Sequence, residues 1–108
     1  MLGGLKLEYT CANGMRNVIE FGDTVVAYWS LDANDRVSNR NENIPYHWRE
    51  IRSGLVYAVA HERSIGDVLV LVVDLEGDEI HTACLMGFPA FERPLHFESA
   101  DLTSVIQI

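Results

Sequence analysis

Basic residues are scarce in this sequence. Lysine and arginine together number 8 against 16 aspartates and glutamates, which gives a formal net charge of −8 over 108 residues. A nucleic-acid-binding surface is basic because it contacts phosphates, so this charge argues against nucleic-acid binding. No apolar run approaches the roughly 20 residues that a membrane-spanning helix needs, and the first residues lack the basic and apolar regions of a secretory signal peptide. We therefore expect a cytoplasmic protein without a membrane segment.

Cysteines and catalytic motifs are equally few. The two cysteines, Cys11 and Cys84, fall short of the number that a small secreted domain usually carries, so we expect two reduced thiols. The sequence contains none of the motifs HExxH, CxxC, GxSxG and GxGxxG. It therefore predicts no catalytic residue, no metal ion and no cofactor, and it favours a non-catalytic protein over an enzyme. A pocket in which His61, His81 and His96 converge is a candidate metal or acid–base site that no local motif supports.

Short segments with alternating or β-branched residues dominate the chain, as is typical of β-strands. We expect strands over 5–11, 15–21, 24–31, 55–61, 68–74, 80–86, 95–99 and 102–108. The length suits one domain over 1–108. The pattern predicts a mainly β protein, a single small antiparallel β-barrel or strongly curved sheet of about seven strands with one short helix. The alternative is an α+β sheet with a covering helix.

The middle of the chain differs from the rest. Residues 32–46 hold four of the six asparagines and few apolar residues, so we expect a long polar loop there. Residues 46–53 follow Pro45 and end before Gly54, which are signals that bracket a short helix. Residues 87–94 contain a glycine and two prolines and read as another loop. The aliphatic run 68–74 suggests a strand that is buried on both faces.

Two clusters are candidates for binding. Four carboxylates fall within six residues at a predicted hairpin; they are Asp74, Glu76, Asp78 and Glu79. A solvated turn explains them, but such a patch also attracts a basic partner. The second cluster consists of Tyr46, Trp48, Arg49 and Arg52, which are residue types enriched at interface hot spots. It would form either a binding edge or a cover for one end of the core.

Three functions are compatible with these features. The first is a small acidic, non-catalytic inhibitor or immunity-type protein that neutralises a basic partner protein, including one that acts on nucleic acid. The alternative is an oligomeric small-molecule-binding or catalytic β-barrel with a histidine-lined pocket. The third is an assembly module, in which the strand over 68–74 and the aromatic residues at 46–48 form the seam of a homodimer.

Overall fold

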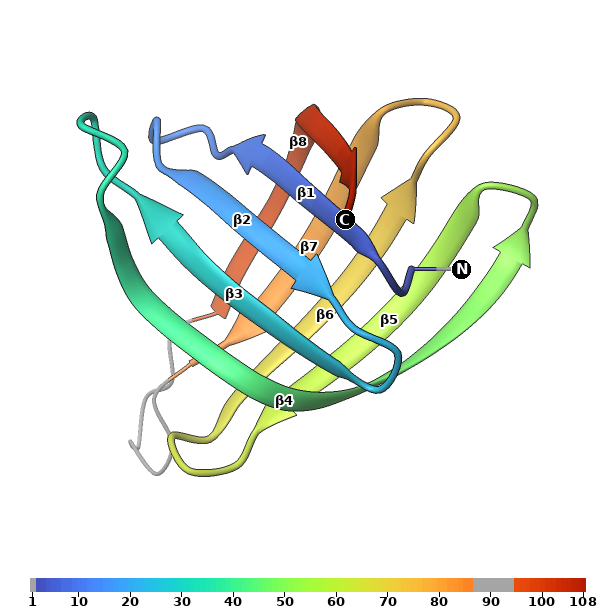
Figure 1. Cartoon of the computed structure of the whole chain (residues 1–108), viewed down its shortest axis with the longest axis horizontal. Helices are drawn as coiled ribbons and strands as arrows, with labels where there is room; N and C mark the ends of the chain where they lie inside the picture. Colours follow the sequence, from blue (N-terminus) through green and yellow to red (C-terminus); the bar gives the residue numbers. More distant parts are fainter. Residues whose placement is uncertain (1, 87–94) are drawn as a thin grey trace.

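The computed structural model describes residues 2–86 and 95–108, and these form eight antiparallel strands without a helix. The strands are β1 (Leu5–Thr10), β2 (Arg16–Phe21), β3 (Val25–Leu31), β4 (Val37–Arg52), β5 (Leu55–Glu62), β6 (Asp67–Asp74), β7 (Glu79–Leu85) and β8 (Leu95–Gln107). They follow one another in sequence order around a closed barrel, and β8 pairs with β1 (Figure 1). The predicted mainly β, barrel-like fold is confirmed. The described residues include no helix that is long and apolar enough to span a membrane.

The barrel consists of two facing sheets that share two long strands. The 16-residue strand β4 pairs with β3 through its first half and with β5 through its second half. The 13-residue strand β8 pairs with β7 first and with β1 afterwards. We call the side formed by β1–β3 sheet A and the side formed by β5–β7 sheet B, each completed by the adjoining halves of β4 and β8. Strands of the two sheets cross in Figure 1, as in orthogonal packing with shared corner strands.

The apolar core fills the end of the barrel near the N-terminus. Its largest fully buried side chains come from both sheets; they are Phe21, Leu2, Leu7, Ile19, Ile44, Ile80, Val18, Val26, Val56 and Val73. Tyr46 packs edge-on against Phe21 with ring centroids 5.4 Å apart. Its hydroxyl donates a hydrogen bond to the Gly22 carbonyl oxygen at 2.7 Å, so this buried polar group is satisfied. Leu2 and Tyr46 together close this end of the barrel.

The helix predicted over residues 46–53 is wrong. This segment is the second half of β4 and pairs with β5 from Tyr46 opposite Ala60 to Arg52 opposite Leu55. Continuous ladder hydrogen bonds with a neighbouring strand outweigh the local helix signals, because a short helix is marginal without tertiary packing. Gly54 does not end a helix but turns the β4–β5 hairpin with a φ of 77°.

The polar loop predicted over about 32–46 is also mostly strand. Only residues 32–36 form the β3–β4 turn, and β4 begins at Val37. Asn39 and Asn43 adopt positive φ values of 53° and 56°, and the β3–β4 pairing shifts register twice alongside. Asparagine tolerates this backbone region better than most residues. The asparagines therefore build an irregular strand, where the composition suggested a loop.

Strand β6 holds the aliphatic run over 68–74. Its inward residues Leu69, Leu71 and Val73 are buried, whereas the outward valines at 68, 70 and 72 are only partly covered within this chain. The prediction of burial on both faces thus holds for the inner face alone. The segments expected as two last strands form the single strand β8. The loop predicted over 87–94 lies outside the described residues.

Candidate functional site

The barrel interior carries a group of polar side chains at the end away from Leu2, next to the buried apolar residues Ala60, Leu69 and Leu71. The polar side chains face inward from both sheets; they are Tyr9, Tyr28, Asp67, Thr82, Cys84 and Glu98. We call this set the polar end. Tyr9 lies one inward position beyond Leu7 on β1, and Cys84 lies two inward positions beyond Ile80 on β7. The interior thus changes from apolar to polar along each of these strands.

Strand register and electrostatics show that the two sheets meet at the polar end. Thr82 on β7 pairs with Glu98 on β8, which places both on the inner face of sheet B. Cys84 of sheet B raises the pKa of Tyr9 and of Tyr28, although both tyrosines belong to sheet A. Groups that influence each other in this way lie near one another across the barrel. The polar end is therefore one cluster and not two separate surfaces.

Burial sets the protonation of these groups. It is the largest cause that raises the pKa of the Tyr9 and Tyr28 hydroxyls well above the usual value, and nearby acidic groups raise both pKa values further. Burial and then the charge of Asp67 raise the pKa of Cys84 to about 11. At neutral pH the polar end thus holds neutral phenols and a neutral thiol. Such groups donate hydrogen bonds, but a thiol in this form is a poor nucleophile.

Two buried hydroxyls of the polar end lack hydrogen-bond partners among the described residues. The residues are Tyr9, which is 6% exposed, and Thr82, which is 7% exposed. Buried polar groups in folded proteins are almost always paired, so each orphan hydroxyl needs an explanation. The Tyr46 hydroxyl, by contrast, has a hydrogen-bond partner in the Gly22 carbonyl oxygen. The two hydroxyls are suited to bind a polar guest, either water or a ligand.

A short hydrogen-bonded chain flanks the polar end on sheet A. Asn17 donates from Nδ2 to the Cys11 sulfur at 3.2 Å, and the Ser30 hydroxyl donates to Asn17 Oδ1 at 3.0 Å. Asn17 pairs with Tyr9 across β1 and β2, and with Ser30 across β2 and β3. Burial, followed by the charge of Glu98, raises the pKa of the Cys11 thiol. These residues therefore extend the same polar interior toward the outside.

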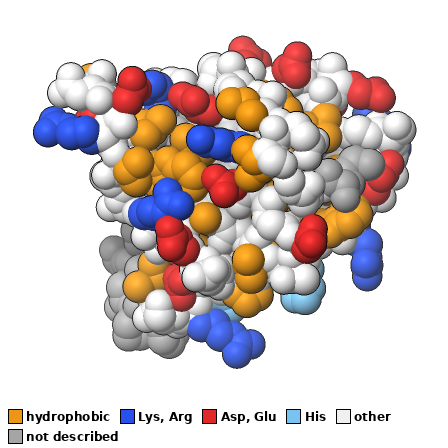
Figure 2. Space-filling view, in the orientation of Figure 1, with side chains coloured by type: hydrophobic (Ala, Val, Ile, Leu, Met, Phe, Trp, Pro, Cys, Tyr) orange, Lys and Arg blue, Asp and Glu red, His pale blue; other side chains and the backbone are white. Residues whose placement is uncertain are grey.

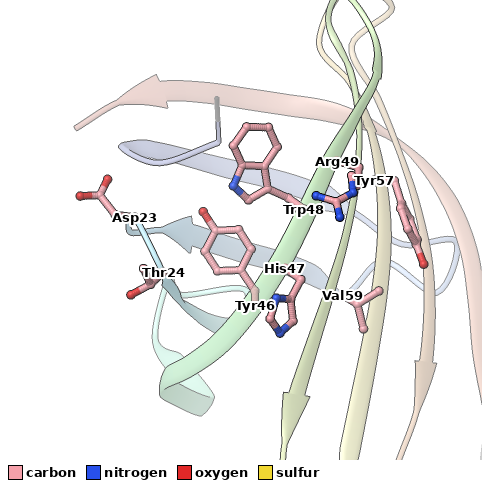
Figure 3. A pocket seen from close by; sticks show the side chains of 8 residues that line it. All are labelled: Asp23, Thr24, Tyr46, His47, Trp48, Arg49, Tyr57 and Val59. Carbon is pink, nitrogen blue, oxygen red and sulfur yellow. The ribbon is translucent and has the colours of Figure 1, made fainter.

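Three of the four residues in the predicted aromatic and basic cluster line a different pocket. Tyr46, Trp48 and Arg49 border a surface pocket of about 540 Å³ beside the β2–β3 turn. In Figure 3, Tyr46 and Trp48 extend to the same side of β4, on which Asp23 also lies. Much of the Tyr46 ring belongs to the core, which supports the alternative that this cluster covers one end of it. Arg52 does not line this pocket.

The four predicted acidic residues lie together on the β6–β7 hairpin. Asp74 pairs with Glu79, and Glu79 pairs in turn with Asp101 of β8. Glu76 and Asp78 occupy the turn between them and are exposed. Asp74, Glu79 and Asp101 thus form a row across three strands, which we call the acidic row. Leu55 pairs with Asp74 on one side and with Arg52 on the other, so Arg52 lies beyond the β5 side of this row. The outer surface at this end of sheet B is thus acidic, with one arginine at its β4 margin.

The three histidines do not converge on one pocket. His61 and His81 lie on the outer face of sheet B, whereas His96 pairs with Cys84 and shares the inner side with it. Consistent with this, residues 2–86 and 95–108 contain no group of three or more side chains that could hold a metal ion. The three histidines therefore do not line one shared pocket.

A cross-strand trio escaped the sequence reasoning. His81 Nδ1 lies 2.8 Å from the Ser99 hydroxyl, and its Nε2 lies 3.4 Å from Glu79 Oε2. The residue types are those of a hydrolytic triad. The His81 and Glu79 side chains are 45% and 50% exposed, however, and water weakens an ion pair at such a position. Only the β7–β8 register brings Ser99 opposite His81, so no local signal could have revealed the trio.

Comparisons with known proteins bear on the fold. No family model matches the sequence, and no curated protein matches it either. Among solved structures, one from Burkholderia vietnamiensis described as a "putative beta-lactamase" superposes with a TM-score of 0.74. It is 13% identical in sequence, and the alignment covers 99% of this chain and 95% of that one. At this identity the likeness shows a shared fold alone.

Proposed function

We propose that the protein binds a small polar molecule inside its barrel, at the polar end. One observation carries this proposal: Tyr9 and Thr82 bury hydroxyls that have no hydrogen-bond partner among the described residues. An eight-stranded barrel is just wide enough either to be filled by its own side chains or to hold one small ligand. The apolar end is filled in this way, and the polar end offers the donors and acceptors that fix a ligand.

The chemistry of the polar end favours a neutral or cationic ligand that carries hydrogen-bond donors. The six residues include two carboxylates, Asp67 and Glu98, and no lysine, arginine or histidine. An anion would therefore meet like charge there, whereas an ammonium group or an alcohol could donate to Glu98. A hydroxyl oxygen of the ligand could accept from the hydroxyls of Tyr9 and Thr82. The ring of Tyr28 adds an aromatic surface that suits a cation or a flat group.

Two probes of the same shape and opposite charge test this preference. Tyramine and 4-hydroxyphenylacetate are to be titrated into isotopically labelled protein within a wider panel of small amines, alcohols and carboxylic acids. We expect amines or alcohols to shift the backbone amide signals of Tyr9, Thr82 and Cys84, and carboxylic acids to have little effect. Absence of such shifts across all amines and alcohols, or preferential binding of the acids, would contradict the proposal.

Matched variants then connect binding to the orphan hydroxyls. Tyr9→Phe and Thr82→Val each remove one hydroxyl and nearly preserve the shape of the side chain. Each should weaken the affinity of the best ligand by about tenfold, as expected when one buried hydrogen bond is lost. Tyr57→Phe is the control, because Tyr57 faces outward from β5. Equal affinity in all three variants would show that the ligand binds elsewhere.

The acidic row favours a second candidate function, the neutralisation of a basic partner protein. Asp74, Glu79 and Asp101 stand side by side on the outer surface, and clustered charge of one sign speeds association with an oppositely charged partner. Reversal of these three charges to lysine should abolish salt-sensitive capture of a basic protein. Glu50→Lys, outside the row, should leave the capture unchanged. If both variants behave alike, the row has no special role.

A further inference from the structure

The outer face of sheet B carries an apolar surface that neither proposed function uses. Nine apolar residues occupy neighbouring outward positions on four strands; they are Tyr57, Val59, Val68, Val70, Val72, Ala83, Leu85, Leu95 and Phe97. Strand pairing makes them contiguous, because Val70 of the central strand β6 lies between Val59 and Ala83, and Ala83 lies beside Phe97. Phe97 is 80% exposed in the single chain.

The outer surface of sheet A differs from that of sheet B. The outward residues of β1 are Lys6, Glu8 and Thr10, as is usual for a strand that faces water on one side. On sheet A the one large outward aromatic, Trp29, lies between Lys6 at 5.8 Å and Arg40 at 4.2 Å from its ring centroid. Figure 2 shows this face, where basic side chains lie among the hydrophobic ones. Sheet A therefore covers Trp29 with basic side chains, whereas Tyr57, Leu95 and Phe97 of the apolar surface on sheet B are exposed.

The size of the outer face of sheet B suits a stable interface. Its five strands, β4 to β8, at about 4.8 Å spacing and its four outward rows at about 6.8 Å give a face of roughly 24 Å by roughly 27 Å. The nine apolar residues fill three of these rows on four of the strands. That corresponds to about 650 Å² before the side-chain relief is counted, and a standard protein–protein interface buries about 800 Å² on each partner. The barrel is flattened, with extents of 39 × 31 × 22 Å, so this face is broad enough to lie against another sheet.

The charges at its margins make this face complementary to itself. Arg49 and Arg52 lie at the β4 margin, and Asp101 lies at the opposite, β8 margin. None of the three has an ion-pair partner among the described residues. A two-fold axis along β6 exchanges the two margins and so sets Arg52 of one copy over Asp101 of the other, because strand pairing places both in the row that runs through Leu55, Asp74 and Glu79. The same axis places Val70 against Val70, as in an isologous contact.

We propose that the protein forms a homodimer through the outer face of sheet B, with the two-fold axis along β6. The two sheets pack face to face, as in an aligned β-sandwich, and bury the nine apolar residues of both copies. The central contact is apolar, and Arg52 of each copy pairs with Asp101 of the partner copy at the rim. The two Asp74 side chains lie near the axis, but each turns back to accept the Gly77 amide at 2.8 Å within its own hairpin.

Sedimentation velocity over about 1–200 µM protein tests the dimer and its face. The wild type should sediment as a dimer at the upper end of this range. Val70→Lys places a charge on the axis twice and should weaken the dimer at least about 100-fold. Ile106→Lys is the control, because Ile106 is an exposed apolar residue that pairs with Lys6 on sheet A. A monomeric wild type, or a dimer disrupted only by Ile106→Lys, would overturn the proposal.

A charge exchange tests the orientation and does not depend on the tolerance of Val70 to substitution. Arg52→Asp and Asp101→Arg should each weaken the dimer about fivefold, as expected for two symmetry-related rim pairs. The double variant restores opposite charges across the interface and should regain most of the wild-type affinity. Additive weakening in the double variant would exclude an axis along β6. Circular dichroism identifies any variant that fails to fold.

Discussion

Replacement of Tyr9 by phenylalanine should stabilise the ligand-free protein. Tyr9 is only 6% exposed, and the substitution keeps its buried ring. It removes one hydroxyl oxygen, which has no hydrogen-bond partner among the described residues. Leaving a buried polar group unpaired costs about 1–3 kcal/mol, and water that reaches the polar end recovers part of this cost. We therefore expect Tyr9→Phe to raise the free energy of unfolding by about 1 kcal/mol. Most substitutions have the opposite sign.

Tyr46→Phe is the matched control. Tyr46 has the same exposed fraction as Tyr9, but its partly buried hydroxyl donates to the Gly22 carbonyl oxygen at 2.7 Å. Its removal breaks a hydrogen bond and leaves a carbonyl unpaired, so Tyr46→Phe should lower the free energy of unfolding by about 1 kcal/mol. Urea denaturation at neutral pH measures both values, and equal m-values show that the folded and unfolded states remain comparable.

The two variants should therefore move the urea midpoint in opposite directions. If Tyr9→Phe destabilises the protein as much as Tyr46→Phe does, the Tyr9 hydroxyl has a partner in the folded protein, and the reasoning for a binding site at the polar end fails. A saturating ligand should reverse the sign for Tyr9→Phe alone, because the wild type then gains a hydrogen bond that the variant cannot make. This reversal would distinguish a ligand-binding hydroxyl from a merely strained one.

Three further predictions concern the frame of the barrel. Ile80→Ala should lower the free energy of unfolding by about 2–5 kcal/mol in urea denaturation, because Ile80 is fully buried, whereas Ile106→Ala should cost under about 0.5 kcal/mol. Gly54→Ala should cost about 1–2 kcal/mol, since its φ is 77° and a Cβ would lie 2.8 Å from Glu76 Cγ. The raised pKa of Cys84 favours the neutral thiol in the fold, so stability should fall as pH rises from 9.0 toward about 11. Cys84→Ala should make this decline shallower in alkaline denaturation curves, and the raised pKa values of Cys11, Tyr9 and Tyr28 account for the decline that remains.

Local signals predicted the strands and the hairpins well. The segments over 68–74 and 80–86, separated by Glu76, Gly77 and Asp78, form the paired strands β6 and β7. Residue alternation and turn residues act over a few positions, so one sequence is enough to reveal them. The acidic cluster belongs to the same class of prediction, because four neighbouring carboxylates on a hairpin remain neighbours whatever the rest of the fold does.

Local signals failed where a distant strand decided the conformation. Pro45 and Gly54 are placed as a helix start and a helix stop would be, and nothing between them forbids a helix. Residues 46–52 become a strand because β5 offers them a ladder of hydrogen bonds and because Tyr46 completes the apolar core beside Phe21. Neither partner is visible from the segment itself. The same reason hides the strand character of the asparagine-rich half of β4, which follows β3.

The polar end could not be predicted from the sequence at all, since its members come from five strands of the chain. Tyr9, Tyr28 and Asp67 lie among apolar strand residues, where each reads as an ordinary core or strand-end position. They become one site only when the two sheets face each other. The converse holds for the three histidines, which the sequence allows to converge and which strand alternation separates onto different faces.

The register between β7 and β8 decides which chemistry lies inside the barrel. In the observed pairing Thr82 lies opposite Glu98, and both face the interior, while His81 and Ser99 face outward. Because side chains alternate along a strand, a slip of one residue in either strand would exchange the inward and outward sets of that strand. It would also bring the buried Ile80 to the surface, which costs hydrophobic stabilisation. The apolar end therefore fixes the register, and the register in turn places the orphan hydroxyl of Thr82 on the inner face of the barrel.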